Sequence, residues 1–204
     1  TMKRTMMQFY PMQVHAVAVA GALGLIVALS AAAPAQTADG AVVAPDAATT
    51  PAFAFPPAGE ARLLNAAGID QLLTTHGKRL LVVNFWATWC APCVAEIPHF
   101  IEVSDEYRKK NVLFVGLSAD FVDEWKTTVT PFLKEKKVPY PNFVLDVDPN
   151  WMIPKFSKDW SGSLPATFYY DGAGRLLGHR IGAVEKKTLE ADIEKYLKAE
   201  KEGG

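Results

Sequence analysis

The pattern of apolar and polar residues after about residue 61 is that of short buried strands alternating with helices. Leu80–Trp86 and Val112–Ser118 are mostly apolar, with β-branched or aromatic members, which predicts two strands buried on both faces. Residues 142–147 are expected to form another strand. Segments 166–170 and 175–181 enclose a turn sequence with two glycines, so they are predicted to pair as a β-hairpin.

Helices are predicted between and after these strands. Gly77 should end the helix expected over residues 67–76. Pro131 should kink or split the one over 121–137, and Pro154 should interrupt the one over 149–157. The order of elements calls for an α/β domain with a central mixed β-sheet, helices on both faces and right-handed crossovers between parallel strands. The predicted helices cover residues 67–76, the cysteine motif to about 110, 121–137, 149–157 and 185–200.

The first 35 residues follow a different pattern, with a positive start and then a run without charge over residues 16–33. The run ends at Ala33-Pro34-Ala35, which fits the cleavage site of a signal peptide. It is also at the short edge of what spans a bilayer. Residues 1–35 are therefore predicted to be a cleaved signal peptide or an N-terminal membrane anchor.

Residues 36–60 are rich in Ala, Pro and Thr and almost free of charge, which predicts a flexible or extended linker. Residues 61–204 then form the folded domain. This organisation predicts a periplasmic or other extracytoplasmic protein, either soluble after cleavage or tethered to the inner membrane.

Composition narrows the function classes. The chain has 204 residues, half of them apolar, and a net charge of −1, so nothing in its charge favours a nucleic-acid partner. It has only two cysteines, Cys90 and Cys93. A bridge between residues so close in sequence restricts the unfolded chain little, so reactivity or metal binding explains the pair better than stabilisation.

The motif Trp89-Cys90-Ala91-Pro92-Cys93 lies between a predicted strand and a predicted helix. Unpaired N–H groups and the helix dipole favour a thiolate at Cys90 and lower its pKa. Pro92 suits the first helical turn. Cys93 lies on nearly the same helix face and can attack a mixed disulfide formed at Cys90. The motif therefore predicts a dithiol/disulfide cycle.

A metal site is the alternative use of two close cysteines. Structural zinc needs four ligands and catalytic zinc usually needs three, and the chain offers no second cysteine pair. His76, His99 and His179 stand alone in the sequence and are expected to be ordinary surface or partly buried residues. No metal or other cofactor is expected.

Two polar residues near the cysteines are candidates for supporting roles. Glu96 follows Cys93 by three positions and faces the same side, so its carboxylate could accept and return the proton of Cys93. The alternative is a solvated glutamate in the first helical turn. Asn84 lies inside a buried strand, where an amide is costly unless it is hydrogen-bonded, and its role is either near the site or structural.

Residues 83–93, VNFWATWCAPC, followed by Glu96-Ile97-Pro98, resemble the thioredoxin superfamily and, within it, the TlpA/ResA-like exported disulfide reductases. The resemblance spans about residues 61–200 and includes Ser163-Leu164-Pro165-Ala166-Thr167-Phe168, which matches the cis-proline loop of the family. It implies a thioredoxin fold in which residues 121–161 hold a strand–helix insertion before that loop.

The resemblance also implies roles. Cys90 attacks, Cys93 resolves, and a cis Pro165 packs against the disulfide and shapes the substrate groove. Trp86 and Trp89 are expected to wall the site, although Trp86 can equally belong to the core. Asn84, Ala91, Pro92 and Leu164 are the remaining groove or support residues.

Two departures from relatives bear on these roles. Cytoplasmic thioredoxins carry an aspartate where this chain has Asn84, so Glu96 is the natural replacement acid. Cytochrome-maturation relatives often carry a glutamate after the cis-proline, where this chain has Ala166, which weakens an assignment to that pathway.

The leading function is a thiol–disulfide oxidoreductase that reduces disulfides in exported client proteins and receives electrons from a membrane-embedded donor. Ala91 and Pro92 cannot donate a side-chain hydrogen bond to sulfur, so the dithiol is not strongly favoured as it is in oxidants. One alternative is a thiol peroxidase, whose site usually has a single reactive cysteine with a threonine and an arginine nearby. Here Thr88 lies near the motif, but no arginine does. Another is a copper-handling thiol module, which would need a further soft ligand.

Overall fold

The computed structural model describes residues 53–202 of the chain. The predicted signal peptide or anchor lies outside this range, as does most of the predicted linker. Within residues 53–202, no helix combines the length and the apolar character needed to cross a membrane. Phe53 and Phe55 come from the predicted linker, yet their rings lie 5.6 and 6.4 Å from that of Phe143. The end of that segment therefore packs on the folded domain.

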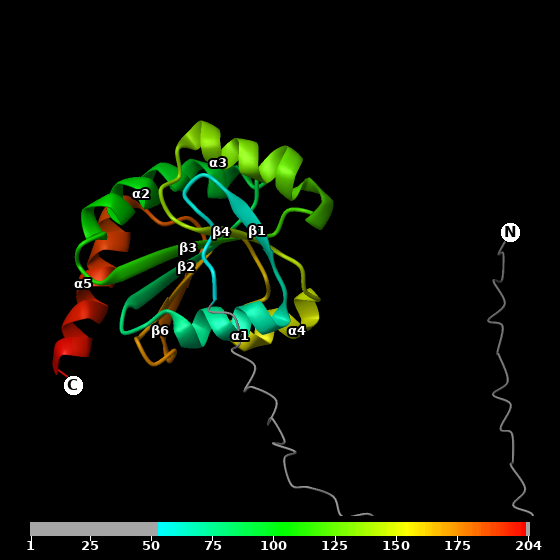
Figure 1. The fold of residues 1–204 in the computed structure, drawn as a ribbon. Helices are drawn as coiled ribbons and strands as arrows, with labels where there is room; N and C mark the ends of the chain where they lie inside the picture. The colour runs from blue at the N-terminus through cyan, green and yellow to red at the C-terminus, as the bar shows by residue number, and fades with distance from the viewer. Residues whose placement is uncertain (1–52, 203–204) are drawn as a thin grey trace, which may run out of the picture. The chain divides into compact units, whose positions relative to one another are not determined.

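A six-stranded mixed sheet forms the centre of the domain, in the order β1-β4-β3-β2-β5-β6 (Figure 1). The first four strands in this order are parallel, and β5 runs antiparallel to both β2 and β6. The mixed sheet predicted from the sequence is confirmed. The strands are β1 Ala61–Leu64, β2 Leu80–Trp86, β3 Val112–Ser118, β4 Asn142–Leu145, β5 Ala166–Tyr170 and β6 Leu176–Ile181.

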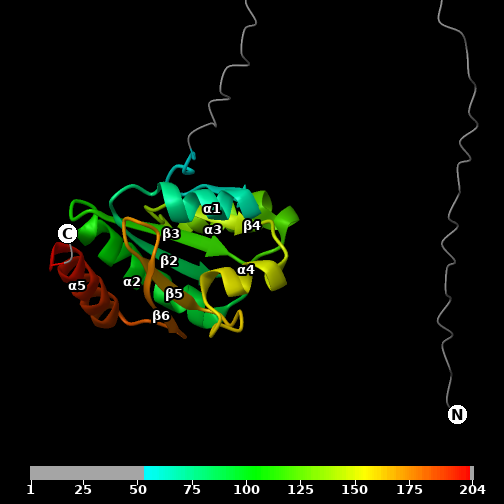
Figure 2. The ribbon, with the colours of Figure 1, turned by 90° about the horizontal axis from the view of Figure 1, so that it is seen from below.

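Helices cover both faces of the sheet, and each face has its own buried apolar cluster. Residues of α2, α3 and α5 contribute to one cluster, and residues of α1 and α4 contribute to the other. Helices α4 and α5 lie toward opposite ends of the sheet (Figure 2). The helices are α1 Ala66–Thr75, α2 Ala91–Tyr107, α3 Thr130–Lys136, α4 Pro149–Phe156 and α5 Lys186–Glu202.

The structure departs from the sequence prediction in two elements and confirms a split in a third. The predicted helix over 121–137 is divided into a 3-10 turn, a π-helical turn and α3, and Pro131, which was expected to kink or split it, sits in the first turn of α3. The prediction that Pro154 interrupts the fourth helix was wrong. Helix α4 continues through Pro154 because burial of Met152 and Phe156 holds this short helix to the core. Strand β1 was not predicted; only four residues long, it pairs with β4.

Strand β2 positions the functional site. All of its residues are buried because it lies between β3 and β5. Its last residue, Trp86, is in register with Ser118 at the end of β3. The loops that follow these two strands therefore leave the sheet side by side, and one of them carries the cysteines.

Candidate active site

Cys90 and Cys93 form a disulfide at the N-terminus of α2, with their Cα atoms 5.2 Å apart. Cys90 is the N-cap residue, and its Sγ accepts a hydrogen bond from the backbone N–H of Cys93 at 3.3 Å. Its exposed fraction is 7%, whereas that of Cys93 is 0%. Pro92 occupies the first turn, where its missing N–H costs no helical hydrogen bond. Cys90 is thus the sulfur that a partner molecule can approach.

Glu96 is buried on α2 with an exposed fraction of only 2%. Its Oε1 accepts a hydrogen bond from Asn84 Nδ2 at 2.8 Å, and its Oε2 accepts one from Val184 N–H at 2.8 Å. Burial raises the pKa of Glu96 to about 7, against the lowering effect of these two hydrogen bonds. Glu96 is therefore not a solvated glutamate, and it can change protonation near neutral pH.

Asn84 projects from β2 to Glu96, so its amide belongs to the site. While Nδ2 donates to Glu96, the buried Oδ1 has no hydrogen-bond partner. An amide carries both donors and an acceptor. Asn84 can donate to a Glu96 carboxylate or, with the amide turned over, accept from a protonated Glu96.

Asp120 was missed by the sequence analysis. It follows β3, is buried, and accepts hydrogen bonds from the backbone N–H of Thr88 at 3.0 Å and from Ser118 Oγ at 2.6 Å. The Thr88 hydroxyl also donates to it. Asp120 thereby ties the end of β3 to the loop that leads into Cys90. An acidic residue two positions after a buried strand was the available signal.

The loop before β5 forms another side of the site. The Leu164–Pro165 peptide bond is cis, as predicted. The carbonyl oxygen of Pro165 accepts a hydrogen bond from Gly182 N–H at 2.9 Å, and Trp160 Nε1 donates to the carbonyl oxygen of Ser163 at 2.9 Å. These contacts hold the loop between the insertion and β6.

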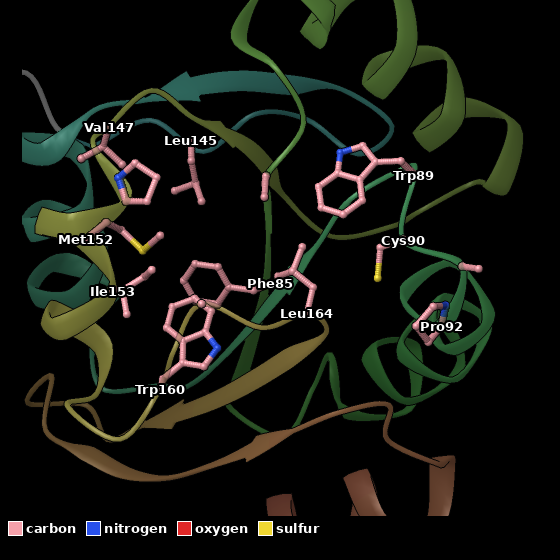
Figure 3. Close-up of a pocket in the computed structure, with 14 residues that line it drawn as sticks. Phe85, Trp89, Cys90, Pro92, Leu145, Val147, Met152, Ile153, Trp160 and Leu164 are labelled. Atoms are coloured by element: carbon pink, nitrogen blue, oxygen red, sulfur yellow. The ribbon is translucent and has the colours of Figure 1, made fainter. Parts of the chain in front are cut away.

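An apolar cavity of about 500 Å³ lies between the cysteine motif, the cis-proline loop and the insertion formed by β4 and α4 (Figure 3). None of the side chains in its wall carries a formal charge. Cys90 lies at one end, and the side chains of α4 lie at the other. Prominent wall residues are Phe85, Trp89, Cys90, Met152, Ile153, Trp160 and Leu164.

The sequence profile of the AhpC/TSA family matches residues 49–177, which is more than half of the chain. The chain belongs to the AhpC/TSA family. The AhpC/TSA domain thus covers β1 through the start of β6 and includes both cysteines, Glu96, Asp120 and the cis-proline loop.

Individual proteins of similar sequence carry the names of thiol–disulfide exchange proteins. The chain is 33% identical over 125 residues to the thiol-disulfide oxidoreductase ResA of Bacillus cereus, covering 61% of this chain and 67% of ResA. It is 32% identical over 123 residues to the thiol:disulfide interchange protein HelX of Rhodobacter capsulatus, covering 58% of this chain and 61% of HelX. The predicted ResA-like resemblance and oxidoreductase class are confirmed.

A solved structure of similar fold is the thiol:disulfide interchange protein of the thioredoxin family from Chlorobium tepidum TLS. It matches with a TM-score of 0.51 and 25% identity over 60% of this chain and 83% of that protein. The thioredoxin fold predicted from the sequence is confirmed.

Trp86 and Trp89 have different environments in this AhpC/TSA domain. Trp89 has an exposed fraction of 63% and lines the cavity, as do Ala91 and Pro92. Trp86 is buried, and its Nε1 donates to Asn142 Oδ1 at 3.1 Å. Of the two alternatives for Trp86, the structure supports the core.

His76, His99 and His179 lie on different elements, at the end of α1, in α2 and in β6. His76 is fully buried between the carbonyl oxygens of Leu72 and Asp171, so the expectation of a surface or partly buried residue was wrong for it. The end of α1, at Leu72, and the turn after β5, at Asp171, enclose its ring. Among the described residues, no group of three or more His, Cys, Asp or Glu side chains is arranged to hold a metal ion.

Proposed function

We propose that this protein reduces disulfides in exported client proteins by cycling Cys90 and Cys93 between the dithiol and the disulfide. The observation that carries this proposal is the asymmetry of the pair. Cys90 caps a helix N-terminus at the edge of a cavity, while Cys93 is wholly buried within reach of it. An approachable nucleophile beside a shielded second thiol is the arrangement that disulfide exchange requires.

In the proposed cycle, the Cys90 thiolate attacks one sulfur of the client disulfide, and the other client sulfur leaves and takes up a proton. Cys93, as a thiolate, then attacks Cys90 Sγ in the mixed disulfide and releases the second client sulfur. Two electrons pass to the client, and the Cys90–Cys93 disulfide remains. The N–H of Cys93, which donates to Cys90 Sγ, supports the Cys90 thiolate.

Glu96 is proposed as the proton acceptor and donor for Cys93. It lies one helical turn after Cys93, and its pKa of about 7 lets it hold or release a proton near neutral pH. Asn84 is proposed to keep the carboxyl group oriented in both protonation states. Pro165 is proposed to shape the groove next to the disulfide, with Trp89 and Leu164 as its walls.

The proposed direction is reduction. Ala91 and Pro92 offer no side-chain donor to the Cys90 sulfur, so a strongly stabilised dithiol, the source of oxidising power, is not built into the motif. A carboxylate at Glu96 further disfavours a negative sulfur nearby. A reductant in an oxidising compartment needs electrons from a membrane-embedded donor, which completes the proposed cycle. Within the described chain, no arginine lines the cavity, which gives a thiol peroxidase less support.

A measured reduction potential tests this direction. The protein is equilibrated in dithiothreitol and glutathione redox buffers, and the dithiol fraction is read by mass after alkylation. A potential near about −270 mV supports a reductase, whereas one near about −120 mV, the value of a strong oxidant, contradicts it.

Location and domain organisation are part of the proposal. Residues 1–35 are proposed to direct export or to anchor the protein, and the residues after them to link this segment to the folded domain. Fractionation of expressing cells, followed by mass determination of the intact protein, tests both. An intact chain in the cytoplasmic fraction contradicts export, and a mass lacking about residues 1–35 distinguishes cleavage from anchoring.

A further inference from the structure

The cavity beside Cys90 has a composition that selects among clients. We infer that it binds an apolar side chain next to the client cysteine, so that the protein prefers disulfides set in apolar, uncharged segments. This inference rests on the proposed function, because disulfide exchange is what brings a client cysteine to Cys90.

Cys90 is itself part of the cavity wall, so a client sulfur bonded to Cys90 Sγ lies at the end of the cavity (Figure 3). Neighbouring residues of a polypeptide are only about 3.8 Å apart between Cα atoms. A residue directly before or after the client cysteine therefore reaches into the cavity. The cavity volume of about 500 Å³ is ample for one large side chain.

The far wall of the cavity is formed by Val147, Met152 and Ile153 from the insertion, and Phe85 and Trp160 lie between them and the cysteine motif. A charged side chain that entered this space would lose hydration without gaining an ionic partner from the wall. An apolar side chain would instead remove apolar surface from water on both sides of the contact.

The cavity wall is held in place by packing within the protein. The Phe85 ring lies 4.7 Å from that of Phe156 in an edge-to-face contact and 4.5 Å from that of Trp160, which fixes the insertion on the sheet. Ile153 packs so closely over Gly162 that a Cβ there would lie 2.6 Å from Ile153 Cδ1. The wall of α4 and the loop before the cis-proline therefore form one packed surface, and binding does not have to order it.

The test uses symmetric peptide disulfides, (Ac-Gly-X-Cys-X-Gly-NH2)2, in which X is Leu, Glu or Lys. Each reaction consumes one protein dithiol and one peptide disulfide and yields the Cys90–Cys93 disulfide and two peptide thiols. Second-order rate constants are measured with pre-reduced protein and divided by the rate constant of each peptide with dithiothreitol. The Leu peptide is expected to react at least about tenfold faster than both charged peptides, the scale of selectivity of apolar pockets.

Charge placed in the wall should redirect the preference. Ile153→Lys is expected to remove most of the advantage of the Leu peptide and to bring the Glu peptide ahead of the Lys peptide. Val147→Lys, at the same wall, provides a second variant if the first does not fold as judged by circular dichroism. Leu176→Lys adds the same charge at an exposed apolar position on β6 that is not part of the cavity wall, and its peptide preference should be that of the unmodified protein.

The outcomes separate the inference from the proposed function. Equal normalised rates for all three peptides, or a fastest reaction with the Lys peptide, would overturn the apolar selectivity while leaving disulfide reduction in place. An unchanged preference in both wall variants would also overturn it. If no peptide disulfide is reduced by the protein, the proposed function itself fails.

Discussion

The two sides of the Cys90–Cys93 disulfide are built from opposite kinds of residue. On the interior side, polar groups are hydrogen-bonded in pairs: buried Glu96 with buried Asn84, and buried Asp120 with half-buried Thr88. On the open side, the cavity wall is apolar and uncharged. Buried polar groups need specific hydrogen-bond partners, so they fix the geometry and can exchange protons, whereas an apolar wall accepts any apolar side chain of suitable size.

Substitution of either cysteine is expected to have the largest effect and to distinguish the open sulfur from the interior one. Cys90→Ser and Cys93→Ser should each reduce turnover of a disulfide substrate by at least about 10³-fold, because the pair acts as a unit. Only Cys93→Ser should retain a mixed disulfide with the substrate, and mass spectrometry of the trapped adduct reads this out. An adduct on Cys93 in the Cys90→Ser protein would reverse the assignment of the open and interior sulfurs.

Glu96→Gln should slow disulfide exchange by about 10²-fold at pH 7, the lower end of what general acid–base groups contribute. The rate of the unmodified protein should change with pH around 7, where Glu96 titrates, and the variant should lose that inflection. Stopped-flow rates from pH 5 to 9 provide the measurement. Glu102→Gln, at an exposed position of the same helix, serves as the matched control. Identical pH profiles for Glu96→Gln and the unmodified protein would remove Glu96 from proton transfer.

The same group should make stability depend on pH. Burial raises the pKa of Glu96 from 4.5 to about 7, so between these values the folded protein binds more protons than the unfolded chain. The contribution of Glu96 to the free energy of unfolding is complete below about pH 4.5. It is lost as the pH rises through 7, by up to about 3 kcal/mol. Urea unfolding of the oxidised protein at pH 5 and pH 8 measures this difference. It should shrink in Glu96→Gln; an equal difference in both proteins would contradict the assignment.

Asp120→Asn tests the other interior polar group. The amide keeps one acceptor but cannot accept from Thr88 N–H, Thr88 Oγ and Ser118 Oγ as a carboxylate does. A loss of about 1–3 kcal/mol in the free energy of unfolding is expected. Asp123→Asn, an exposed position three residues later, should change stability by less than about 0.5 kcal/mol. Equal effects in the two variants would show that the carboxylate does not brace the cysteine loop.

The smallest effect is expected on the open side. Trp89→Ala removes an exposed ring from the cavity wall and should slow reduction of apolar peptide disulfides by about two- to fivefold, because little of the ring is already buried. Its free energy of unfolding should change by less than about 0.5 kcal/mol. A loss of stability as large as that of Asp120→Asn would mean that the open side also supports the fold.

Much of the fold was predictable because its strongest signals are local. The central strands have the same bounds in the prediction and in the structure, since a run buried on both faces is apolar at nearly every position. Elements whose signals are weak were missed or misjudged. Strand β1 depends on pairing with β4, and α4 continues through Pro154 because the core holds it.

By itself, the sequence determined the reacting atoms and their local placement: Cys90 caps a helix, and Cys93 and Glu96 follow at one-turn intervals. Only the tertiary structure decided their surroundings. Val184 N–H reaches Glu96 from 88 positions away, and Asp120 reaches Thr88 from 32 positions away. Burial, which sets the pKa of Glu96 and the character of the cavity, depends on which distant segments cover a residue. The spacing along a helix cannot specify that.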